Sequence, residues 1–514
     1  MRSFLALLAL SAILVAFASW LEGSEIWRHP LEWLRTLDQE AKLALLSGSA
    51  QVVAGVLAIL ITVVAIVLEL SATRYTHRVT ELFARDPLNL AVMIFYVLTA
   101  VICITLATVL SGQLGAEPAV PNGGFLLAMA MMTVSMVGLL PYFVYVFNFV
   151  SPLDIIARIR GDALRRVERA TADDSREAKR AVIDAVEDLE DVARGAMKNN
   201  DRGIAMAAVE SLATLLADVA AMRDRLPAAW FQIDDTIARD PDFVALAETA
   251  FEEIARDRTW LEAKILRQYL ALFGDAVGTA RDVASMIAIH TRRLSESFAP
   301  DQPAALALCQ RAFHSYLRAA INASDPRTAY FVLHQYRLLG ETLLGIGARQ
   351  AVLELAERIR FYGRLASDAG LPFLLEVSAY DLAHLVEAAA DDTATRDALV
   401  EIVLTVDHAG AEHLLGVRRA QLQLATFFLL RGDAPPARRI AQDLATEHPA
   451  LLEAARRELE REISPIYWEI NDRGANFAYL PPDRRERLPE LFDLVAGLRR
   501  VSNTVIGGPT PRND

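Results

Sequence analysis

The sequence has few cysteines, no excess of basic residues and none of the common catalytic motifs. Only Cys103 and Cys309 are present in 514 residues, so a disulfide framework or a cysteine-rich metal site is excluded. The formal net charge of -13 argues against a nucleic-acid-binding protein, which normally presents a basic face. G-x-S-x-G, P-loop and H-E-x-x-H patterns are absent. We therefore predict no catalytic residues, no metal, no cofactor and no nucleic-acid partner, and we do not expect an enzyme.

Strand-like alternation of apolar and polar residues is also missing. The hydrophobic content is 53%, yet 23% of the residues are charged. This combination suits a membrane segment joined to a large water-soluble part, and a chain of this length exceeds a single compact core. The sequence therefore predicts an all-α protein with an N-terminal transmembrane helical bundle, followed by a cytosolic helical-hairpin domain that is solenoid-like and partly tetratricopeptide-like.

Long apolar runs define the first domain, residues 1–150. Val52 to Leu68 is an uncharged run that is apolar except for Thr62, and it can cross a membrane as a helix because a helix satisfies its own backbone hydrogen bonds. We predict an amphipathic interfacial helix over 30–46, ahead of this run. Residues 1–18 also fit a cleaved signal peptide, but the length of the first run favours an uncleaved span. The predicted spans are 4–21, 51–70, 90–110 and 125–150.

A stripe of small and polar residues runs along the second span with a period of 3.5 residues, so its members share one helix face. Small residues allow helix backbones to approach closely in lipid, which favours a helix-packing face. The alternative is a pore lining, with Thr62 at mid-depth and the two polar ends at the mouths. The stripe consists of Gln51, Gly55, Ala58, Thr62, Ala65 and Glu69.

Arginines in the short flanks set the orientation. Three of them lie between the second and third spans, and more follow the last span, whereas the loop 111–124 has no Lys or Arg. The positive-inside rule then places everything after Val150 in the cytoplasm. We interpret the membrane-proximal basic residues as an ordinary positive flank, with contact to anionic lipids as the alternative. They are Arg158, Arg160, Arg165, Arg166 and Arg169.

The second domain, residues 151–505, is predicted to consist of successive helices, with a flexible tail at 506–514. Aspartates suited to N-cap positions predict several helix starts: Asp201, Asp240 before Pro241, and Asp325 before Pro326. The segment 421–449 predicts two helices that meet at Gly432-Asp433 and resembles a tetratricopeptide unit. Arrays of this kind usually offer a face to another protein or to a second copy.

The histidines and most aromatic residues of the second domain are predicted to have structural roles, in surface pairs or in helix packing. Asp381 and His384 share a helix face and are expected to form a solvated pair. His408 and His413 are five residues apart and do not share a face, so they predict no metal site. Aromatic residues of the predicted helices are expected to lie in helix–helix cores: Tyr330, Phe331, Tyr336, Phe361 and Tyr362.

Residues 51–110, with ITVVAIVLELSATRYTHRVTELFARDP at their centre, resemble the bacterial predicted-membrane-protein family called domain of unknown function 2254. That family also has a downstream S-P-x-x-N-D-P element, which is matched in part by Asn200-Asp201 and by Ser464-Pro465 with Asn471-Asp472. Arg202 and Arg473 stand where the family has Pro. The resemblance implies a bacterial inner-membrane protein with no established activity, and it supplies no catalytic residues.

Two hypotheses for function follow. The first is a multi-pass inner-membrane protein that presents a cytosolic helical array for protein binding or self-assembly. The second is an oligomeric ion channel, in which the Gln51–Glu69 stripe lines the pore and the cytosolic domain gates it. Membrane lipids, further copies of the chain and a cytosolic protein are the expected partners.

Overall fold

A computed structural model describes residues 13, 37–74, 86–111, 122–149, 151–406, 414–469 and 471–506. Within these ranges every regular element is a helix, and β pairing is limited to one isolated bridge between Ile466 and Ala475. The all-α prediction is therefore confirmed. The chain forms two compact units, residues 1–159 and 160–514. Most of the predicted first span, the histidines at 408 and 413, and the tail after residue 506 lie outside the described residues.

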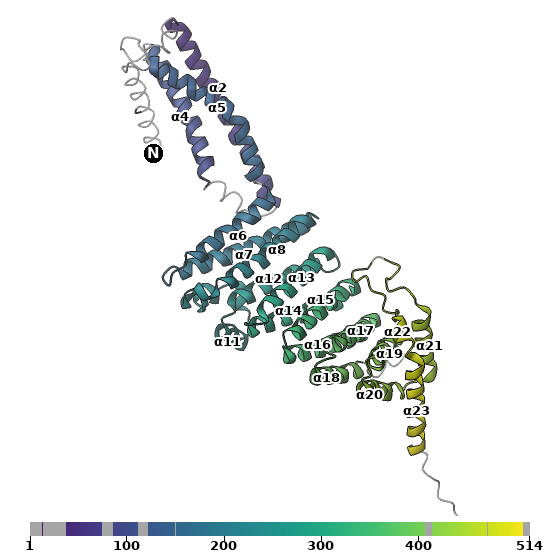
Figure 1. The fold of residues 1–514 in the computed structure, drawn as a ribbon. Coiled ribbons are helices and arrows are strands. Elements are labelled where there is room, and N and C mark those ends of the chain that lie inside the picture. The colour runs from purple at the N-terminus through teal and green to yellow at the C-terminus, as the bar shows by residue number, and fades with distance from the viewer. Residues whose placement is uncertain are drawn as a thin grey trace, which may run out of the picture. The chain divides into compact units, whose positions relative to one another are not determined.

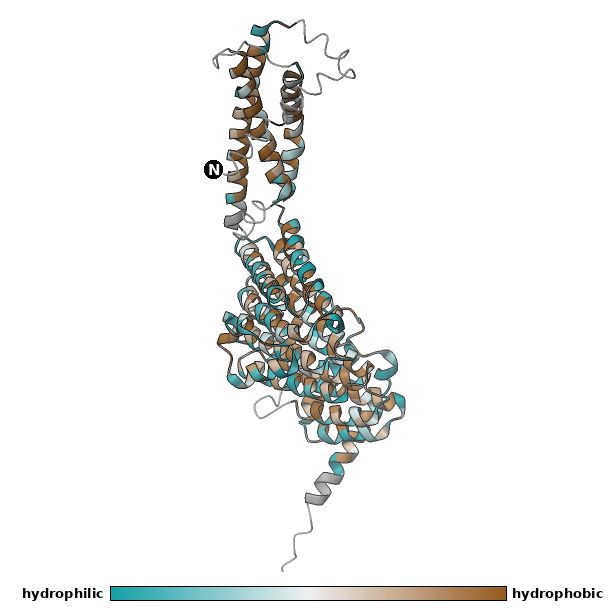
Figure 2. Cartoon of the chain, turned by 90° about the vertical axis from the view of Figure 1, so that its left-hand side faces the viewer, coloured by the Kyte–Doolittle hydropathy of each residue, from teal (hydrophilic) through white to brown (hydrophobic). Residues whose placement is uncertain are grey.

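The first unit contains α2 (Gln39–Arg74), α4 (Pro87–Leu110) and α5 (Asn122–Phe149). Each is long and apolar enough to cross a membrane. Figure 2 shows that hydrophobic residues cover these helices along most of their length. The predicted spans 51–70, 90–110 and 125–150 fall on them. One helix of the second unit, α8 (Arg202–Ala221), also meets these length and composition criteria.

Packing in the first unit explains one difference from the sequence prediction. Residues 39–46 do not form a separate interfacial helix, because α2 continues through Ser47 and Gly48 without a break. The Ser47 hydroxyl donates to the carbonyl of Leu43 at 2.8 Å, so its polar group is satisfied within the helix. Leu46 is fully buried in the apolar core that α2 shares with α4 and α5. The start of the predicted helix, 30–36, lies outside the described residues.

The second unit begins within α6 (Pro152–Glu168) and continues with regular helices, most of them joined by short connections. These are α7 (Ser175–Lys198), α8, α12 (Trp260–Ala276), α13 (Arg281–Phe298), α14 (Pro303–Asn322), α15 (Pro326–Gly345), α16 (Arg349–Asp368), α17 (Pro372–Ala388), α18 (Thr393–Leu404), α19 (Leu415–Arg431), α20 (Ala434–Leu444), α21 (Pro449–Arg461), α22 (Pro482–Arg485) and α23 (Leu488–Ile506).

These helices pack in two layers (Figure 1). In the first layer, α7, α12, α14, α16, α18 and α20 each contact the next. In the second layer, α8, α13, α15, α17 and α19 do the same, and consecutive helices pair across the layers. Each helix therefore buries apolar residues against both its own layer and the facing one. Whether the array is a regular solenoid or tetratricopeptide-like remains a prediction.

Local sequence signals explain most helix boundaries. The Asp201 carboxylate accepts from the amide of Ile204 at 3.4 Å, and Asp325 accepts from Thr328 at 3.3 Å, as expected of N-caps. Gly432 has a φ of 71°, the left-handed conformation that ends α19 before α20 starts. These helix starts and the α19–α20 break are confirmed.

The helix that starts after Asp240, as predicted, is only four residues long and belongs to an irregular segment between α8 and α12. This segment contains η3 (Arg223–Arg225), η4 (Ala228–Phe231), α9 (Asp235–Ala238), α10 (Pro241–Val244) and α11 (Glu248–Asp257). Asp240 is held at the start of α10, 2.7 Å from the buried Lys264 Nζ of α12. Phe243 of α10 is also buried. The backbone of Ala247 is extended and separates α10 from α11.

Candidate functional site

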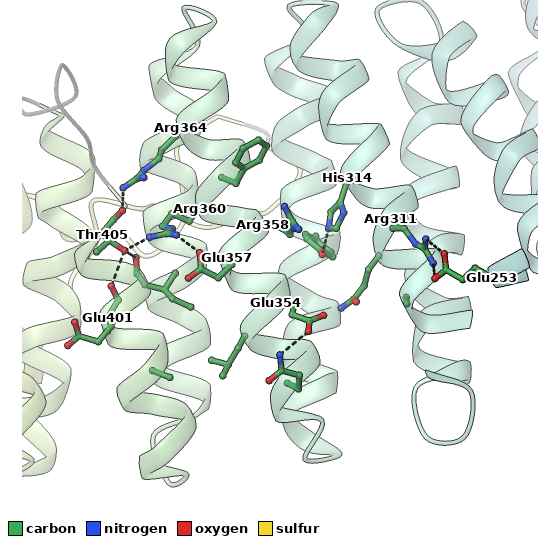
Figure 3. Close-up of a pocket in the computed structure, with 18 residues that line it drawn as sticks. Glu253, Arg311, His314, Glu354, Glu357, Arg358, Arg360, Arg364, Glu401 and Thr405 are labelled. Carbon is green, nitrogen blue, oxygen red and sulfur yellow. Dashed lines mark hydrogen bonds and ion pairs between the residues drawn. The ribbon is translucent and has the colours of Figure 1, made fainter. Parts of the chain in front are cut away.

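A groove of about 1200 Å³ runs over the first layer of the second unit, across α14, α16 and α18 (Figure 3). Its floor includes the Tyr336 ring, which is completely buried, and its rim includes Phe361, whose side chain is 44% exposed. Charged side chains from all three helices project into it, and Glu253 of α11 closes one end. A groove that combines aromatic surface with charged side chains of both signs suits a peptide better than a small apolar ligand.

Most carboxylates of the groove are already neutralised by arginines. Arg311 makes two hydrogen bonds to Glu253, at 2.9 and 3.1 Å. Arg360 pairs with Glu357 and also donates to the Thr405 hydroxyl at 2.6 Å. Glu401 pairs in a similar two-bonded way with an arginine of α20 outside the groove. The negative charge of these glutamates is therefore compensated locally.

Cations gather around His314 in the middle of the groove. Burial, followed by the nearby charges of Arg358 and Arg311, lowers the pKa of His314 to about 4. The imidazole is therefore neutral near pH 7, and its Nε2 shares a hydrogen bond of 2.9 Å with the Tyr336 hydroxyl. Arg358 is exposed beside it (Figure 3) and has no ion pair among the described residues. Arg318, one turn along α14, stacks on Phe361 and Tyr362.

An apolar pocket of about 180 Å³ adjoins the groove and lies between α11, α12 and α14. Arg311 and Glu253 line both cavities, so their ion pair stands between them. Asp257, Arg267, Thr259 and Ser315 also line the pocket, and the remaining lining is aliphatic, including Leu266, Leu270 and Leu308. Its volume suits a single aliphatic or aromatic side chain.

The second layer carries a different feature on α15, α17 and α19. Residues 462–481, which we call the strap, connect α21 to α22. The described residues of the strap form no helix and bond to α15, α17 and α19. Arg473 makes two bonds to Asp381 of α17, and Gln423 of α19 donates to the carbonyls of Phe477 and Tyr479 at 3.0 and 3.1 Å. The Phe477 ring stacks on Tyr380 at 4.5 Å. The array therefore binds an irregular segment of its own chain on this face, and that segment folds back on itself at the bridge between Ile466 and Ala475.

Two sequence predictions are corrected by the structure. Asp381 is not part of a solvated pair with His384, because its side chain is fully buried against Arg473 and Arg337. Phe361 is likewise exposed rather than part of a helix–helix core, whereas Tyr336 and Tyr362 are buried as predicted.

The predicted stripe of α2 lies on an exposed helix face. All six of its residues are exposed in the single chain, and a Cβ placed on Gly55 meets no atom within 4 Å. The face that packs on α4 and α5 is the opposite one, which includes Val53, Leu60 and Val64. Thr62 donates to the carbonyl of Ala58 at 2.9 Å, which satisfies its hydroxyl within the helix. The role of the stripe, packing or pore lining, remains a prediction.

The basic residues after the last span begin on α6. Arg158 lies over the Phe149 ring at 3.8 Å, and Arg166 pairs with Glu177 of α7 at 2.8 Å. Arg165 pairs with Asp162 one turn away. Arg169 is exposed and Arg160 is half-buried. The structure does not bring these residues together into a single pocket, which suits a charged flank.

The groove was not predicted, because its residues come from helices far apart in the sequence and each looks like part of a solvated face. One signal was available for Phe361. The buried positions of α16 include Leu355, Ile359 and Tyr362, and Phe361 falls outside this helical spacing.

Comparison with curated proteins and with solved structures found no match to this chain. The model of one family, described as Predicted membrane protein (DUF2254), matches residues 2–188. This range covers the three described apolar helices of the first unit and most of α7, whereas the groove and the strap lie beyond it. The resemblance seen in the sequence is thus confirmed over the N-terminal third or so of the chain, which is similar to this family of predicted membrane proteins.

Proposed function

We propose that this membrane protein presents its second unit, on the cytoplasmic side of a bacterial inner membrane, as a binding surface for a segment of another protein. The groove across α14, α16 and α18 is the observation that carries the proposal. The arginines that flank the spans support the orientation, and the family match supports the membrane location. In this proposal the protein is a binding and assembly protein rather than an enzyme.

Two observations, one on the groove and one on the strap, support a peptide as the occupant of the groove. It crosses three helices of one layer, so an extended or helical segment can contact side chains from each of them. The strap on the second layer supports the same idea, since three helices hold that segment through a buried ion pair, backbone carbonyls and an aromatic stack. The array thus offers chemistry suited to holding polypeptide.

A site-specific photocrosslinker tests this proposal in intact cells. Benzoylphenylalanine in place of Glu354, which lines the groove, should give a discrete protein adduct after irradiation. The same residue in place of Arg438, which is exposed on α20 outside the groove, is the matched control and should not. Absence of an adduct at 354, or the same adducts at both positions, contradicts the proposal.

Exposure of the whole α2 stripe favours a second candidate, self-association through this face, with an oligomeric channel as its most specific form. The oligomeric mass of the protein in mild detergent is the first test. A closed ring supports conduction, whereas a monomer excludes a pore built from several copies.

A further inference from the structure

We propose that an acid-sensitive latch holds the strap on the second layer, and that protonation of His334 on α15 releases it. The latch is a chain of four side chains that runs from His334 through Arg337 and Asp381 to Arg473 of the strap. This inference concerns the second layer and is independent of the function proposed for the groove.

The hydrogen bonds of the latch require a neutral His334. Its Nδ1 lies 3.2 Å from Nη2 of Arg337, and because a guanidinium can only donate, Nδ1 accepts this bond and carries no proton. Arg337 also pairs with Glu341 of its own helix, and its Nε lies 3.3 Å from a carboxylate oxygen of Asp381. Asp381 in turn accepts two bonds from Arg473. A proton on Nδ1 would remove the acceptor and place a second cation beside Arg337.

Charged groups on the strap, α13 and α17 also act on His334. Burial, followed by the charges of Arg473 and Arg337, lowers the pKa of His334 to about 4. Arg292 of α13 acts in the same direction, and Asp381 of α17 opposes them. When the strap leaves, Arg473 leaves with it and the ring loses one of its neighbouring cations. Protonation of His334 therefore favours the released strap.

The strap can leave its site while the helices stay packed. Its described residues form no helix, and the side chains of Ile463 and Trp468 are 76% and 73% exposed. Besides the latch, its contacts to α17 and α19 include the two bonds from Gln423 and the stacking of Phe477 on Tyr380. A segment with few buried contacts opens at a lower free-energy cost than packed helices do.

Proton linkage gives the direction and the size of the effect. With the strap bound, the pKa of His334 is about 4, and after release it moves toward the ordinary histidine value of about 6.5. The released form therefore binds the proton more tightly, and strap binding weakens as the pH falls through this window. Between pH 7.5 and pH 5 the equilibrium constant for strap binding falls at most roughly 30-fold.

Hydrogen exchange of the full-length protein in detergent, followed by mass spectrometry, measures strap release. The amides of Asn476 and Tyr479 are hydrogen-bonded in the bound strap, and protection factors correct for the pH dependence of the intrinsic exchange rate. We expect their protection factors to fall about 10- to 30-fold between pH 7.5 and pH 5, while the amides of α17 stay protected. Arg473→Gln breaks the latch and should show low strap protection already at pH 7.5.

Histidine variants assign the effect to the latch. His334→Gln keeps an acceptor for Arg337 but cannot become charged, so it should abolish the pH dependence of strap protection. His314→Gln is the matched control, because burial also lowers the pKa of His314 to about 4 but this residue lies in the groove of the first layer. His384→Gln is a second control on α17, near Arg337. Both controls should keep the wild-type response.

Circular dichroism melting confirms that each variant is folded, and His334→Asn, another uncharged amide, replaces His334→Gln if that variant unfolds. Strap protection that is the same at pH 7.5 and pH 5 in the wild type overturns the inference. An unchanged pH response in the His334 variant, wild-type protection in Arg473→Gln, or loss of strap protection only together with that of the helices also overturns it.

Discussion

Arg473 and Asp381 form a buried ion pair that joins the strap to α17. The two guanidinium nitrogens lie 2.5 and 3.1 Å from the two carboxylate oxygens, and the side chains are 3% and 0% exposed. Arg473 also donates to the carbonyl of Tyr330 at 2.9 Å and stacks on its ring. Because both charges are removed from water, each depends on the other for compensation.

Removing Arg473 should therefore be costly. Arg473→Ala leaves Asp381 buried with only Arg337 nearby, and we expect a loss of stability of about 3–5 kcal/mol. Arg327→Ala is the matched control, because Arg327 also pairs with the strap, at Asp472, but is largely exposed. Its loss should cost about 1 kcal/mol or less. Denaturant unfolding followed by circular dichroism measures both, and equal losses contradict a special role for the buried pair.

Close packing of α16 on α17 depends on Gly363. A Cβ at this position would lie 2.5 Å from the Ser378 hydroxyl and 2.7 Å from its Cβ, so Gly363→Ala should force the helices apart at a cost of about 1–3 kcal/mol. Gly274 of α12 is exposed and has no atom near an added Cβ. Gly274→Ala should instead stabilise the helix by about 0.5–1 kcal/mol. Thermal melting should show opposite shifts, and a shift in the same direction for both contradicts the packing argument.

Acid should destabilise the second unit because two of its histidines resist protonation in the folded state. Burial, followed by nearby arginines, lowers the pKa of both His314 and His334 to about 4, below the ordinary histidine pKa of about 6.5. The unfolded chain therefore binds protons as the pH falls through about 6.5, and the folded chain binds them only near 4, so stability decreases across this window. Each histidine should contribute on the order of 1–3 kcal/mol.

The histidine contribution is isolated by substitution. His314→Gln and His334→Gln together should flatten the loss of stability between pH 6.5 and 4, measured by denaturant unfolding at a series of pH values. An unchanged pH dependence in the double variant would show that other groups are responsible.

The sequence predicted what local patterns determine. Apolar runs identified α2, α4 and α5, and side-chain caps such as Asp201 and Asp325 placed helix starts. Burial of Asp381 was missed because its partner Arg473 lies 92 residues further along the chain. The groove was missed for a similar reason, since its charged residues on α14, α16 and α18 meet only in the packed array. Pairings of this kind leave no periodic signal in one sequence.

Membrane orientation is tested with introduced cysteines. The arginine distribution predicts that the loop 111–124 lies outside the cytoplasm and that the second unit lies inside. A cysteine at Ala116 should react with a membrane-impermeant thiol reagent in intact cells, and one at Asp174 should react only after lysis. Cys103 and Cys309 are buried, so the background should be low. The reverse pattern of labelling contradicts the predicted orientation.

The stripe on α2 gives the last prediction. If Gly55 and Ala58 face a helix of another copy, Gly55→Leu should separate the helices and weaken assembly by about 1–3 kcal/mol, seen as a loss of oligomer in detergent. In the single chain Gly55 is exposed and an added Cβ meets no atom within 4 Å, so the change should leave the single chain folded. Ile59→Leu, at an exposed position outside the stripe, is the control and should leave the oligomer intact.

If the stripe lines a pore instead, Thr62→Leu should leave assembly intact and abolish ion flux in bilayer recordings, and Glu69→Gln should change cation selectivity. A wild-type protein without conductance, combined with an oligomer that Gly55→Leu disrupts, would leave packing as the function of the stripe.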